Sequence, residues 1–363
     1  MRVTIVLATS TGGVGAHVRS LVERLPEFGV TVTVACPVET EHRFGFAAAG
    51  AAFYPLPIAA APRPVRDGIV VRRLRAMTAG SDVVHAHGLR AAALAGLALG
   101  RRRPGRISLV ATWHNAVLLT GLRRKVLVGL ETLAARRADV MLGVSSDLVD
   151  RASQLGAPEA RLAPVPASAM PPPRRTRSAV RTELGAGDRP VVLAVGRLAL
   201  QKDYDTLLAA AAHLQGHPAR PLVVVAGDGP EQERLQRVID AHHLPVRLLG
   251  RRNDVPDLLT VADVYVLSSQ WEGSPLVVQE AMAAGVPVVA TAVGGVPEMV
   301  RTGAVLVPAG DSDAIAREVR ALLEDADRRA ELSERARAVA ATWPDEAETA
   351  RQVARVYREL AAR

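Results

Sequence analysis

Two glutamates, Glu272 and Glu280, are the residues whose types and spacing most directly suggest chemistry. They lie eight positions apart in residues 268–291, which read SSQWEGSPLVVQEAMAAGVPVVAT. If a helix begins at Pro275, Glu280 lies about 7–8 Å along its axis, at a rise of about 1.5 Å per residue. A helix N-terminus attracts phosphate. The spacing therefore fits a diphosphate at the helix start and the ribose of the same nucleotide at Glu280.

A loop, a helix and a strand must hold these glutamates in place. Pro275 suits the first helical position because its missing N–H would be unpaired there, and Ser274 can cap behind it. Gly285 can end the helix in a left-handed conformation, and the apolar run Val286–Thr291 is typical of a buried parallel strand. A single Glu on a helix is usually solvated. The rest of this helix is apolar, however, so we expect Glu280 to have a binding partner.

Arg197 and Lys202 form a second candidate group. They flank a loop that follows the strand expected at 190–195 and opens the helix expected at 204–213. Both side chains can bind an anion there, near a helix N-terminus. Of the 45 Lys and Arg residues, only Lys125 and Lys202 are lysines. A lysine at position 202 of such an arginine-biased chain indicates a specific requirement for an ammonium group.

The stretch around the glutamates resembles the E-x7-E signature of the retaining glycosyltransferases of family four. The matching segments are E-G-S-P, Q-E-A-M-A, G-V-P-V-V-A-T and G-G-V-P-E. The resemblance implies the α/β fold called GT-B, in which two Rossmann-like domains face each other across a cleft and a C-terminal helix crosses back to the first domain. It also implies transfer of a sugar from a nucleotide-diphosphate sugar to an acceptor hydroxyl, with no metal ion or other cofactor.

The same resemblance assigns roles to individual residues. Glu280 is expected to accept hydrogen bonds from the ribose, and Glu272 from the sugar. Backbone amides around Gly273 to Leu276 are expected to stabilise the departing diphosphate together with two basic side chains. The expected catalytic residues are Glu272, His114, Arg197 and Lys202. The expected donor-binding residues are Gly12, Gly13, Arg197, Lys202, Arg251, Glu272, Gly273, Ser274, Pro275, Leu276 and Glu280.

The N-terminal half opens with a βαβ pattern. A strand is expected at 2–8, a glycine-rich turn at 9–15, a helix at about 16–25 and a second strand at 30–35. A nicotinamide-binding fingerprint requires G-x-G-x-x-G, but residues 13–18 read GVGAHV and lack the third glycine, which argues against an oxidoreductase. In the resembled family this loop closes over the donor diphosphate, and Gly12 and Gly13 would let backbone N–H groups approach it.

Histidines mark the ends of two further expected strands: one ends in His85 and His87, and the next is followed by His114. Ligands of open α/β sheets bind beyond the carboxyl ends of strands, so His87 and His114 are candidates for the site. We expect only one of His85 and His87 to face inward. His17 fits helix packing as well as it fits a ligand contact. The resembled family has a Thr-x-His near the transferred sugar, which Thr112 to His114 match.

A proline-rich stretch divides the chain. Residues 164–173 contain five prolines, which excludes a helix or a central strand. We expect an N-terminal Rossmann-like acceptor domain at 1–168, a linker at 169–178 and a C-terminal nucleotide-sugar donor domain at 179–344. The last helix, in residues 345–363, is expected to pack on the first domain. The family usually has an Asn-Gly turn before the linker, where this chain has PASAM.

Charge is unevenly distributed along the chain. The 363 residues carry a net charge of +8, and residues 1–170 hold 21 Lys or Arg against 11 Asp or Glu. A basic half can bind nucleic acid, a membrane or an anionic substrate. The clusters Arg101–Arg103 and Arg123–Lys125 suggest peripheral contact of the first domain with an anionic membrane. Solvated helix ends explain the same clusters equally well.

The remaining composition favours an intracellular globular protein. Cys36 is the single cysteine, which excludes an intrachain disulfide and a cysteine-based metal cluster. The apolar run at the N-terminus is too short for a signal peptide, and no stretch approaches the ~20 apolar residues of a membrane span. The expected location is the cytoplasm, at the inner face of the membrane if the basic clusters dock there.

Two other functions remain open at this stage. A sugar-nucleotide epimerase of the same fold would share the diphosphate site, but it would release free sugar or nucleotide instead of needing an acceptor. A nucleic-acid-binding protein would suit the basic charge, but the aromatic content of 3% offers little stacking surface and leaves the glutamates unexplained. We therefore expect a nucleotide-diphosphate sugar and a hydroxyl acceptor as partners, and no nucleic acid. The acceptor is expected to be a cell-envelope lipid or glycan, or a natural product.

Overall fold

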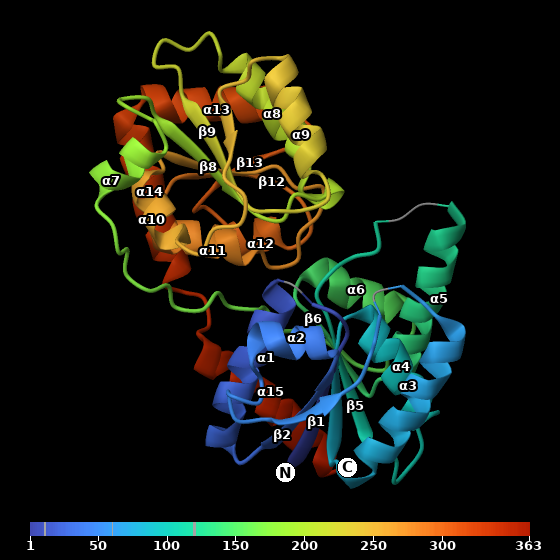
Figure 1. Cartoon of the computed structure of the whole chain (residues 1–363). Helices are drawn as coiled ribbons and strands as arrows, with labels where there is room; N and C mark the ends of the chain where they lie inside the picture. The colour runs from blue at the N-terminus through green and yellow to red at the C-terminus, as the bar shows by residue number, and fades with distance from the viewer. Residues whose placement is uncertain (11, 60, 119–120) are drawn as a thin grey trace. The chain divides into compact units, whose positions relative to one another are not determined.

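The computed structural model describes residues 1–10, 12–59, 61–118 and 121–363, apart from the side chains at 122 and 123. It contains two compact units, Met1–Ser168 with Pro344–Arg363, and Ala169–Trp343. Each unit is built on a parallel sheet with helices on both faces (Figure 1). The predicted α/β class with two Rossmann-like domains is confirmed.

The first unit contains a seven-stranded parallel sheet in the order β3-β2-β1-β4-β5-β6-β7. Its central strands are continuous apolar runs, as expected for strands covered on both faces. The strands are β1 (Arg2–Leu7), β2 (Thr31–Cys36), β3 (Ala52–Pro55), β4 (Val83–His87), β5 (Ser108–Trp113), β6 (Val140–Gly143) and β7 (Ala160–Leu162).

Helices α1 and α15 pack into one hydrophobic core of this unit, on one face of the sheet, while α4 contacts both α3 and α5. The helices are α1 (Gly13–Arg24), α2 (Val38–Phe44), α3 (Pro64–Met77), α4 (Leu89–Leu99), α5 (Gly121–Arg137), α6 (Ser146–Gln154) and α15 (Glu346–Ala361), with short 3-10 turns η1 (Leu25–Phe28) and η2 (Thr78–Gly80).

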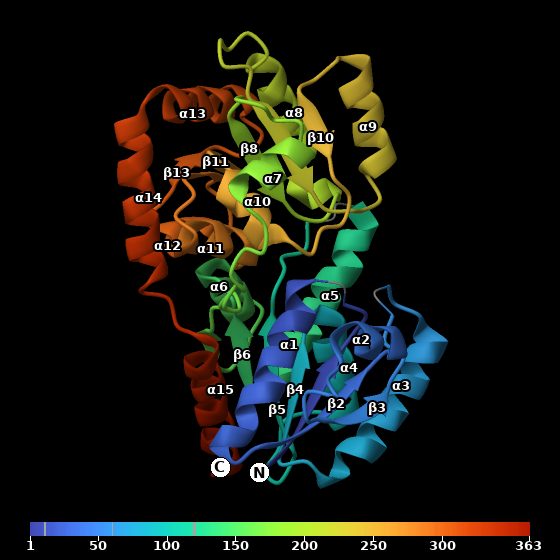
Figure 2. The ribbon, with the colours of Figure 1, turned by 60° about the vertical axis from the view of Figure 1, so that its left-hand side comes forward.

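Helix α15 belongs to the first unit although it follows the second unit in the chain, which confirms the expected return of the C-terminal helix. Asp345 caps it by accepting a hydrogen bond from the N–H of Glu348 (2.7 Å). Its apolar stripe, including Val353, Tyr357 and Leu360, is buried in the same core as α1. Figure 2 shows α15 beside α1. The chain therefore completes its first core with its last helix.

The second unit contains a six-stranded parallel sheet in the order β10-β9-β8-β11-β12-β13. Helices α8, α9 and α13 supply the core on one face, and α7, α10, α11, α12 and α14 supply the core on the other. The strands are β8 (Val191–Val195), β9 (Leu222–Ala226), β10 (Val246–Leu248), β11 (Val264–Leu267), β12 (Val288–Thr291) and β13 (Val305–Val307). The helices are α7 (Arg177–Glu183), α8 (Tyr204–His213), α9 (Gln232–Ala241), α10 (Val255–Val261), α11 (Leu276–Ala283), α12 (Val296–Val300), α13 (Ser312–Glu324) and α14 (Ala326–Ala340), with η3 (Leu200–Lys202).

The stretch between the units is partly anchored in the second one. Helix α7 begins at Arg177, inside the segment 169–178 expected to be a linker. Ahead of it, the buried carboxylate of Asp257 accepts hydrogen bonds from the backbone N–H of Arg174 (2.6 Å) and from Nε of Arg175 (3.1 Å). Within the described ranges, no helix combines the length and the apolar character that crossing a bilayer requires.

Candidate active site

The centre of the second unit's sheet is a topological switch point. The chain runs outward from β8 through β9 to β10, and in the opposite direction from β11 through β12 to β13. The loops that follow β8 and β11 therefore diverge and leave a crevice at the carboxyl ends of these two strands, where ligands of open α/β sheets bind. Residues 196–203 and 268–275 form these two loops.

A buried ion pair joins the two loops. Oε1 of Glu272 accepts hydrogen bonds from Nζ of Lys202 (2.6 Å) and from Oγ of Ser269 (2.6 Å). Glu272 is 7% exposed, and its burial is tolerable because the ammonium and the hydroxyl replace water. Within the part of the chain that the structure describes, Oε2 of Glu272 has no hydrogen-bond partner. That oxygen can accept a hydrogen bond from a hydroxyl group of a ligand.

Three further hydrogen bonds hold the loops together. The Gln201 side chain donates to the carbonyl of Trp271 (2.8 Å), and the N–H of Gln270 donates to the carbonyl of Gln201 (2.8 Å). The hydroxyl of Ser268 donates to the carbonyl of Lys202 (2.9 Å). The position of Glu272 is therefore fixed by both loops.

Two glycines pack against the backbone of Glu272 from the loop after β12. The N–H of Gly295 donates to the Glu272 carbonyl (2.9 Å). Gly294 has a φ of +50°, and a Cβ atom there would lie 2.0 Å from the Glu272 carbonyl oxygen. Both the left-handed backbone and the close approach require glycine at 294. The segment G-G-V-P-E thus supports the Glu272 loop.

Helix α11 begins one residue later than expected. Leu276 is its first residue and Pro275 is the N-cap, with ψ of 102°, so the expectation that Pro275 opens the helix is wrong. The Pro275 carbonyl accepts from the N–H groups of Val278 (3.0 Å) and Gln279 (3.3 Å). The hydroxyl of Ser274 accepts a hydrogen bond from the side chain of Gln279 (2.9 Å), one turn into the helix. As expected, Gly285 follows the helix with φ of +73°.

The start of α11 can bind an anion. Neither Leu276 nor Val277 donates its backbone N–H to another backbone group in the described residues. These N–H groups lie at the positive end of the helix dipole, and the loop that leads to them carries Glu272, the partner of Lys202. Gly273, three residues before Leu276, is buried. The arrangement suits a diphosphate.

Glu280 lies on α11 without a partner. No hydrogen bond or ion pair of its carboxylate is present among the residues that the structure describes, and its side chain is half-buried. Burial raises the pKa of Glu280 to about 7, because the charged form loses water without gaining a counter-charge. A carboxylate in this state is ready to accept hydrogen bonds from a ligand.

The remaining expected donor residues are more exposed. Arg197 follows β8 and Arg251 follows β10, and both are exposed. No ion pair of either is present in the described part of the chain, so the structure does not join them to Glu272. Gly12 and Gly13 are also exposed and lie at the start of α1 in the first unit, where Gly12 is the N-cap.

The first unit has its own switch point between β1 and β4, and histidines gather there. Nδ1 of His87, at the end of β4, lies 3.1 Å from Nε2 of His114, which follows β5. The ring of His17, on α1, lies 5.6 Å from the ring centroids of both. His114 is thus placed beside two histidines that come from different elements.

His85 and His87 both face inward, so the expectation that only one of them does is wrong. Side chains alternate along a strand, and residues two apart therefore point to the same face. Their ring centroids are 4.1 Å apart, and both side chains are buried. His85 is held from two sides: Nδ1 lies 2.6 Å from the hydroxyl of Tyr357 on α15, and Nε2 lies 2.7 Å from Oγ1 of Thr112 on β5.

The four histidines are uncharged at neutral pH. Burial lowers the pKa of His17 to about 4 and that of His85 to about 3, with a smaller contribution from His17 to the latter. Burial, followed by the neighbouring histidines, also holds the pKa of His87 and of His114 well below the ordinary value. They can therefore act as neutral hydrogen-bonding imidazoles.

One atom of this cluster is buried without a partner. Nε2 of His87 has no hydrogen bond among the described residues, although His87 is only 2% exposed. A buried polar atom in this state is costly unless a ligand or a water molecule satisfies it. His87 is therefore a candidate for ligand contact together with His114.

Sequence reasoning did not identify His85, Tyr357 and Ser269 as parts of the site. The spacing of two between His85 and His87 was a sufficient signal that both lie on one face. For Tyr357 the sequence carries no such signal, because its partner lies 272 positions away. Across the described ranges there is no group of three or more His, Cys, Asp or Glu residues that could hold a metal ion.

The comparisons with known families cover both units. Residues 177–339 match the family described as glycosyl transferases group 1. Residues 12–168 match the family described as glycosyl transferase 4-like domain.

Curated relatives match over part of their length. The chain is 33% identical over 268 residues to the GDP-mannose-dependent α-(1-6)-phosphatidylinositol monomannoside mannosyltransferase of Mycolicibacterium smegmatis, covering 67% of this chain and 68% of that protein. It is 27% identical over 263 residues to N-acetyl-α-D-glucosaminyl L-malate synthase of Bacillus anthracis, covering 70% and 69%. It is 31% identical over 190 residues to α-D-kanosaminyltransferase of Streptomyces kanamyceticus, covering 51% and 49%. The chain thus spans about half the length of one relative and just over two thirds of the others.

Solved structures match over the whole chain. HepE of Anabaena in complex with UDP superposes with a TM-score of 0.82 at 21% identity, covering 99% of this chain and 100% of that chain. Sucrose-phosphate synthase of Thermosynechococcus elongatus superposes with a TM-score of 0.81 at 22% identity, covering 100% of both. At this identity the comparison establishes the fold, which is the predicted one.

Proposed function

Because the chain belongs to the glycosyltransferases of group 1, we propose that it transfers a sugar from a nucleotide-diphosphate sugar to a hydroxyl group of an acceptor. The observation that carries the proposal is the Lys202–Glu272 pair, with Nζ 2.6 Å from Oε1, at the switch point of the second unit. Glu272 lies in the loop that opens α11, and Glu280, which has no partner among the described residues, follows eight positions later on that helix. One loop and one helix thus offer groups for the sugar, the diphosphate and the ribose.

The donor is bound by the second unit in this proposal. The backbone N–H groups at the start of α11, with Lys202 and Arg197, stabilise the negative charge that grows on the departing diphosphate. Glu280 accepts hydrogen bonds from the ribose, and the open oxygen of Glu272 accepts one from the sugar. HepE was solved with UDP and with UDP-glucose, and the mycobacterial relative is named as GDP-mannose-dependent. A binding test should therefore include both uridine and guanosine diphosphates.

The acceptor is bound by the first unit in this proposal. Neutral imidazoles at His114 and His87 can hydrogen-bond hydroxyl groups of an acceptor without adding a positive charge. Gly12 and Gly13, at the N-terminus of α1, remain expected donor-binding residues by the family resemblance alone. By family resemblance the reaction retains the anomeric configuration of the sugar. NMR of the product's anomeric proton tests this point.

We propose that no metal ion takes part. An ammonium, a guanidinium and a helix N-terminus already supply positive charge for the diphosphate. Transfer is expected to continue in excess chelator. If the chelator abolishes activity and manganese restores it, the proposal of a metal-free reaction is contradicted.

A ligand-binding panel tests the function before the acceptor is known. A nucleotide diphosphate that binds only the native state raises the melting temperature. UDP, GDP, ADP and their common sugars are compared, and at least one diphosphate is expected to stabilise the protein while the matching nucleoside does not. Absence of stabilisation by every diphosphate would contradict the proposal. A sugar-nucleotide epimerase would convert the stabilising sugar nucleotide in the absence of any acceptor, and product analysis detects this outcome.

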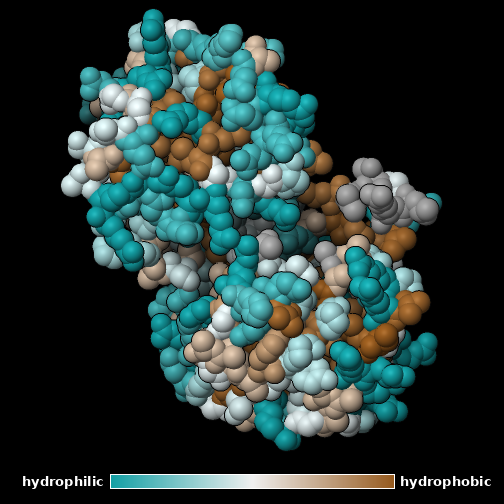
Figure 3. Space-filling view, viewed as in Figure 1, coloured by the Kyte–Doolittle hydropathy of each residue, from teal (hydrophilic) through white to brown (hydrophobic). Residues whose placement is uncertain are grey.

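Peripheral contact with an anionic membrane is a second proposal, supported by a groove in the first unit. This groove of about 510 Å³ is lined by Arg101, Arg102, Gly129, Thr132, Leu133, Arg136 and Arg137, with no acidic residue. Lys125 and the apolar Val126 are exposed on α5, and Leu118, which precedes this helix in the chain, is exposed as well. The side chain of Arg123 lies outside the described residues. Figure 3 shows hydrophobic patches on the otherwise hydrophilic surface of this unit.

Each basic residue near an anionic bilayer contributes about 1 kcal/mol. Co-sedimentation with phosphatidylglycerol vesicles is therefore expected to exceed that with phosphatidylcholine vesicles, and to fall when Arg101 and Arg102 are changed to Gln. Equal binding to both kinds of vesicle would contradict a role of these basic residues in membrane contact.

A further inference from the structure

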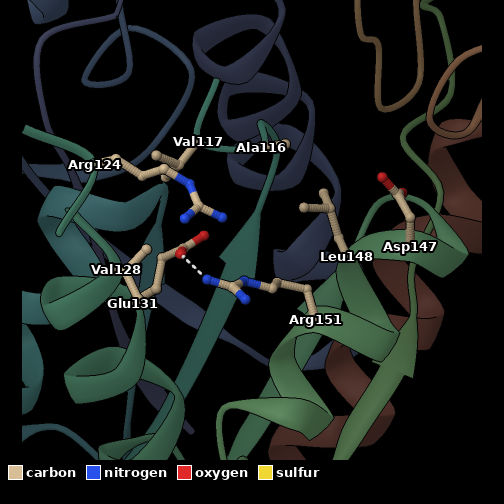
Figure 4. A pocket seen from close by; sticks show the side chains of 8 residues that line it. All are labelled: Ala116, Val117, Arg124, Val128, Glu131, Asp147, Leu148 and Arg151. Atoms are coloured by element: carbon tan, nitrogen blue, oxygen red, sulfur yellow. Dashed lines mark hydrogen bonds and ion pairs between the residues drawn. The ribbon is translucent and has the colours of Figure 1, made fainter. Parts of the chain in front are cut away.

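A small pocket lies in the first unit, next to the segment that carries His114. It has a volume of about 250 Å³ and is lined by Ala116, Val117, Arg124, Val128, Glu131, Asp147, Leu148 and Arg151. Ala116 and Val117 come two and three residues after His114. The other lining residues come from α5 and from the first two turns of α6 (Figure 4). The pocket is therefore at the carboxyl end of the sheet, where the candidate acceptor site lies.

The pocket holds two guanidinium groups and one buried carboxylate between them. Glu131 is 4% exposed, and its Oε2 accepts a hydrogen bond from Nη2 of Arg151 (2.8 Å). The guanidinium of Arg124 points toward Glu131 from the other side (Figure 4). Within the described residues Arg124 has no ion pair of its own. The ion pair neutralises Arg151, so the charge of Arg124 remains in excess over this pocket.

Asp147 brings the net formal charge of the lining to zero, but its carboxylate lies apart from Arg124 (Figure 4). Its Oδ1 accepts a hydrogen bond from the hydroxyl of Ser145 (2.5 Å), and it lies in the first turn of α6, where the helix dipole stabilises a carboxylate. In Figure 4 Leu148 lies between its carboxylate and the guanidinium of Arg124. The rest of the pocket wall is apolar and includes Val117, Val128 and Leu148.

We infer that this pocket binds a carboxylate or phosphate group on the acceptor, with Arg124 as the anion-binding residue and the apolar wall in contact with the carbon atoms beside that group. The inference rests on the proposed function, because it makes the pocket part of the acceptor site. Guanidinium matches both anions through paired N–H donors. A volume just below the ~300–1,000 Å³ of sites for drug-sized ligands limits the pocket to one end of a larger acceptor.

Three probes with one carbon skeleton test the charge requirement: sn-glycerol 3-phosphate, D-glycerate and glycerol. Ligand-observed NMR titrations measure their binding to the full chain. The two anions are expected to bind with millimolar dissociation constants and glycerol to bind at least tenfold more weakly. Equal binding of glycerol and the anions would overturn the inference.

Arg124→Met tests the residue, and Lys125→Met is its matched control. Both changes remove one positive charge from neighbouring exposed positions of α5, but Lys125 does not line the pocket. Arg124→Met is expected to weaken anion binding at least tenfold, and Lys125→Met less than twofold. Equal losses would reduce the effect to net charge and refute the site. Val128→Glu, which adds a carboxylate to the pocket wall, is expected to abolish anion binding as well.

Nucleotide-diphosphate stabilisation of the same variants separates this inference from the proposed function. Arg124→Met is expected to keep it unchanged, because Arg124 is not among the proposed donor-binding residues. Anion binding that depends on Arg124 without any nucleotide binding would remove the glycosyltransferase role and with it the acceptor assignment.

Vesicles distinguish a lipid headgroup from a soluble acceptor. Phosphatidylglycerol vesicles that displace sn-glycerol 3-phosphate, where phosphatidylcholine vesicles do not, support the pocket with a lipid acceptor. Failure of both vesicles to displace it supports the pocket with a soluble anionic acceptor.

Discussion

Among single residues, Glu280 is expected both to bind the ribose of the nucleotide and to destabilise the fold when its carboxyl group is charged. It has no partner in the described part of the protein, and its burial raises its pKa to about 7. Glu280→Gln is expected to weaken nucleotide-diphosphate binding about ten- to hundredfold, the range of hydrogen bonds to a charged group. Since the ribose is unchanged during transfer, turnover at saturating donor is expected to change little. Calorimetry with the nucleotide and saturation kinetics measure both effects.

The pH dependence of Glu280 has a definite sign. A carboxyl whose folded pKa exceeds its unfolded value destabilises the fold progressively as pH rises from about 4.5 to about 7, and by a constant amount above that. Glu280→Gln is therefore expected to raise the melting temperature at pH 8 and to leave it unchanged at pH 4. The wild type is also expected to bind nucleotide more tightly as pH rises through 7, relative to the variant. A melting-temperature difference that is the same at both pH values contradicts the raised pKa.

Glu272 is expected to behave differently from Glu280. Its free oxygen is assigned to the sugar, whose charge and shape change in the transition state, so its contacts can strengthen there. Glu272→Gln keeps an oxygen that can accept from Lys202 and Ser269, and nucleotide affinity is expected to stay within about threefold. Turnover at saturating donor is expected to fall at least about tenfold. If this variant loses nucleotide binding while Glu280→Gln keeps it, the two assignments are reversed.

At the scale of elements, the loop after β12 packs against the loop after β11 and holds the backbone of Glu272 in place. Gly294→Ala places a Cβ 2.0 Å from the Glu272 carbonyl oxygen at a φ of +50°. Gly310→Ala is a matched control, because its φ is +76° but nothing lies within 4 Å of the added atom. Each change costs about 1–2 kcal/mol of backbone strain. Only Gly294→Ala is expected to lower turnover as well, since it displaces the Glu272 loop; equal turnover in both variants would refute that coupling.

Element positions were largely predictable from the sequence. Helix α8 has the predicted bounds, and the strands expected at 2–8, 30–35, 190–195 and 286–291 agree within about two residues, because apolar runs and glycine or proline boundaries act locally. The two glutamates were predicted from their spacing. Their contacts were not: pairing of Lys202 with Glu272 depends on β8 and β11 being neighbours, a property of sheet order that no local pattern carries.

For the whole chain, stability of the first unit depends on its final helix. Tyr357→Phe removes the hydroxyl that lies 2.6 Å from Nδ1 of His85 and leaves a buried nitrogen unpaired, at a cost of about 1–3 kcal/mol. Hydrogen exchange is expected to quicken in the sheet of the first unit and to stay unchanged in that of the second. Arg355→Ala, at an exposed position of the same helix, serves as the control. Equal acceleration in both units would show that they do not unfold separately.

The discontinuous first unit also affects the order in which the protein matures on the ribosome. Residues 169–343 are translated before the segment that holds α15, so the first sheet leaves the exit tunnel without one of the helices that cover it. At about 5–20 residues per second, this delay lasts roughly 9–35 s. Nascent chains arrested soon after the second unit has emerged are expected to resist protease there and to be cleaved in residues 1–168. The sheet made first is thus completed last, and during that interval its exposed apolar face is a binding site for chaperones.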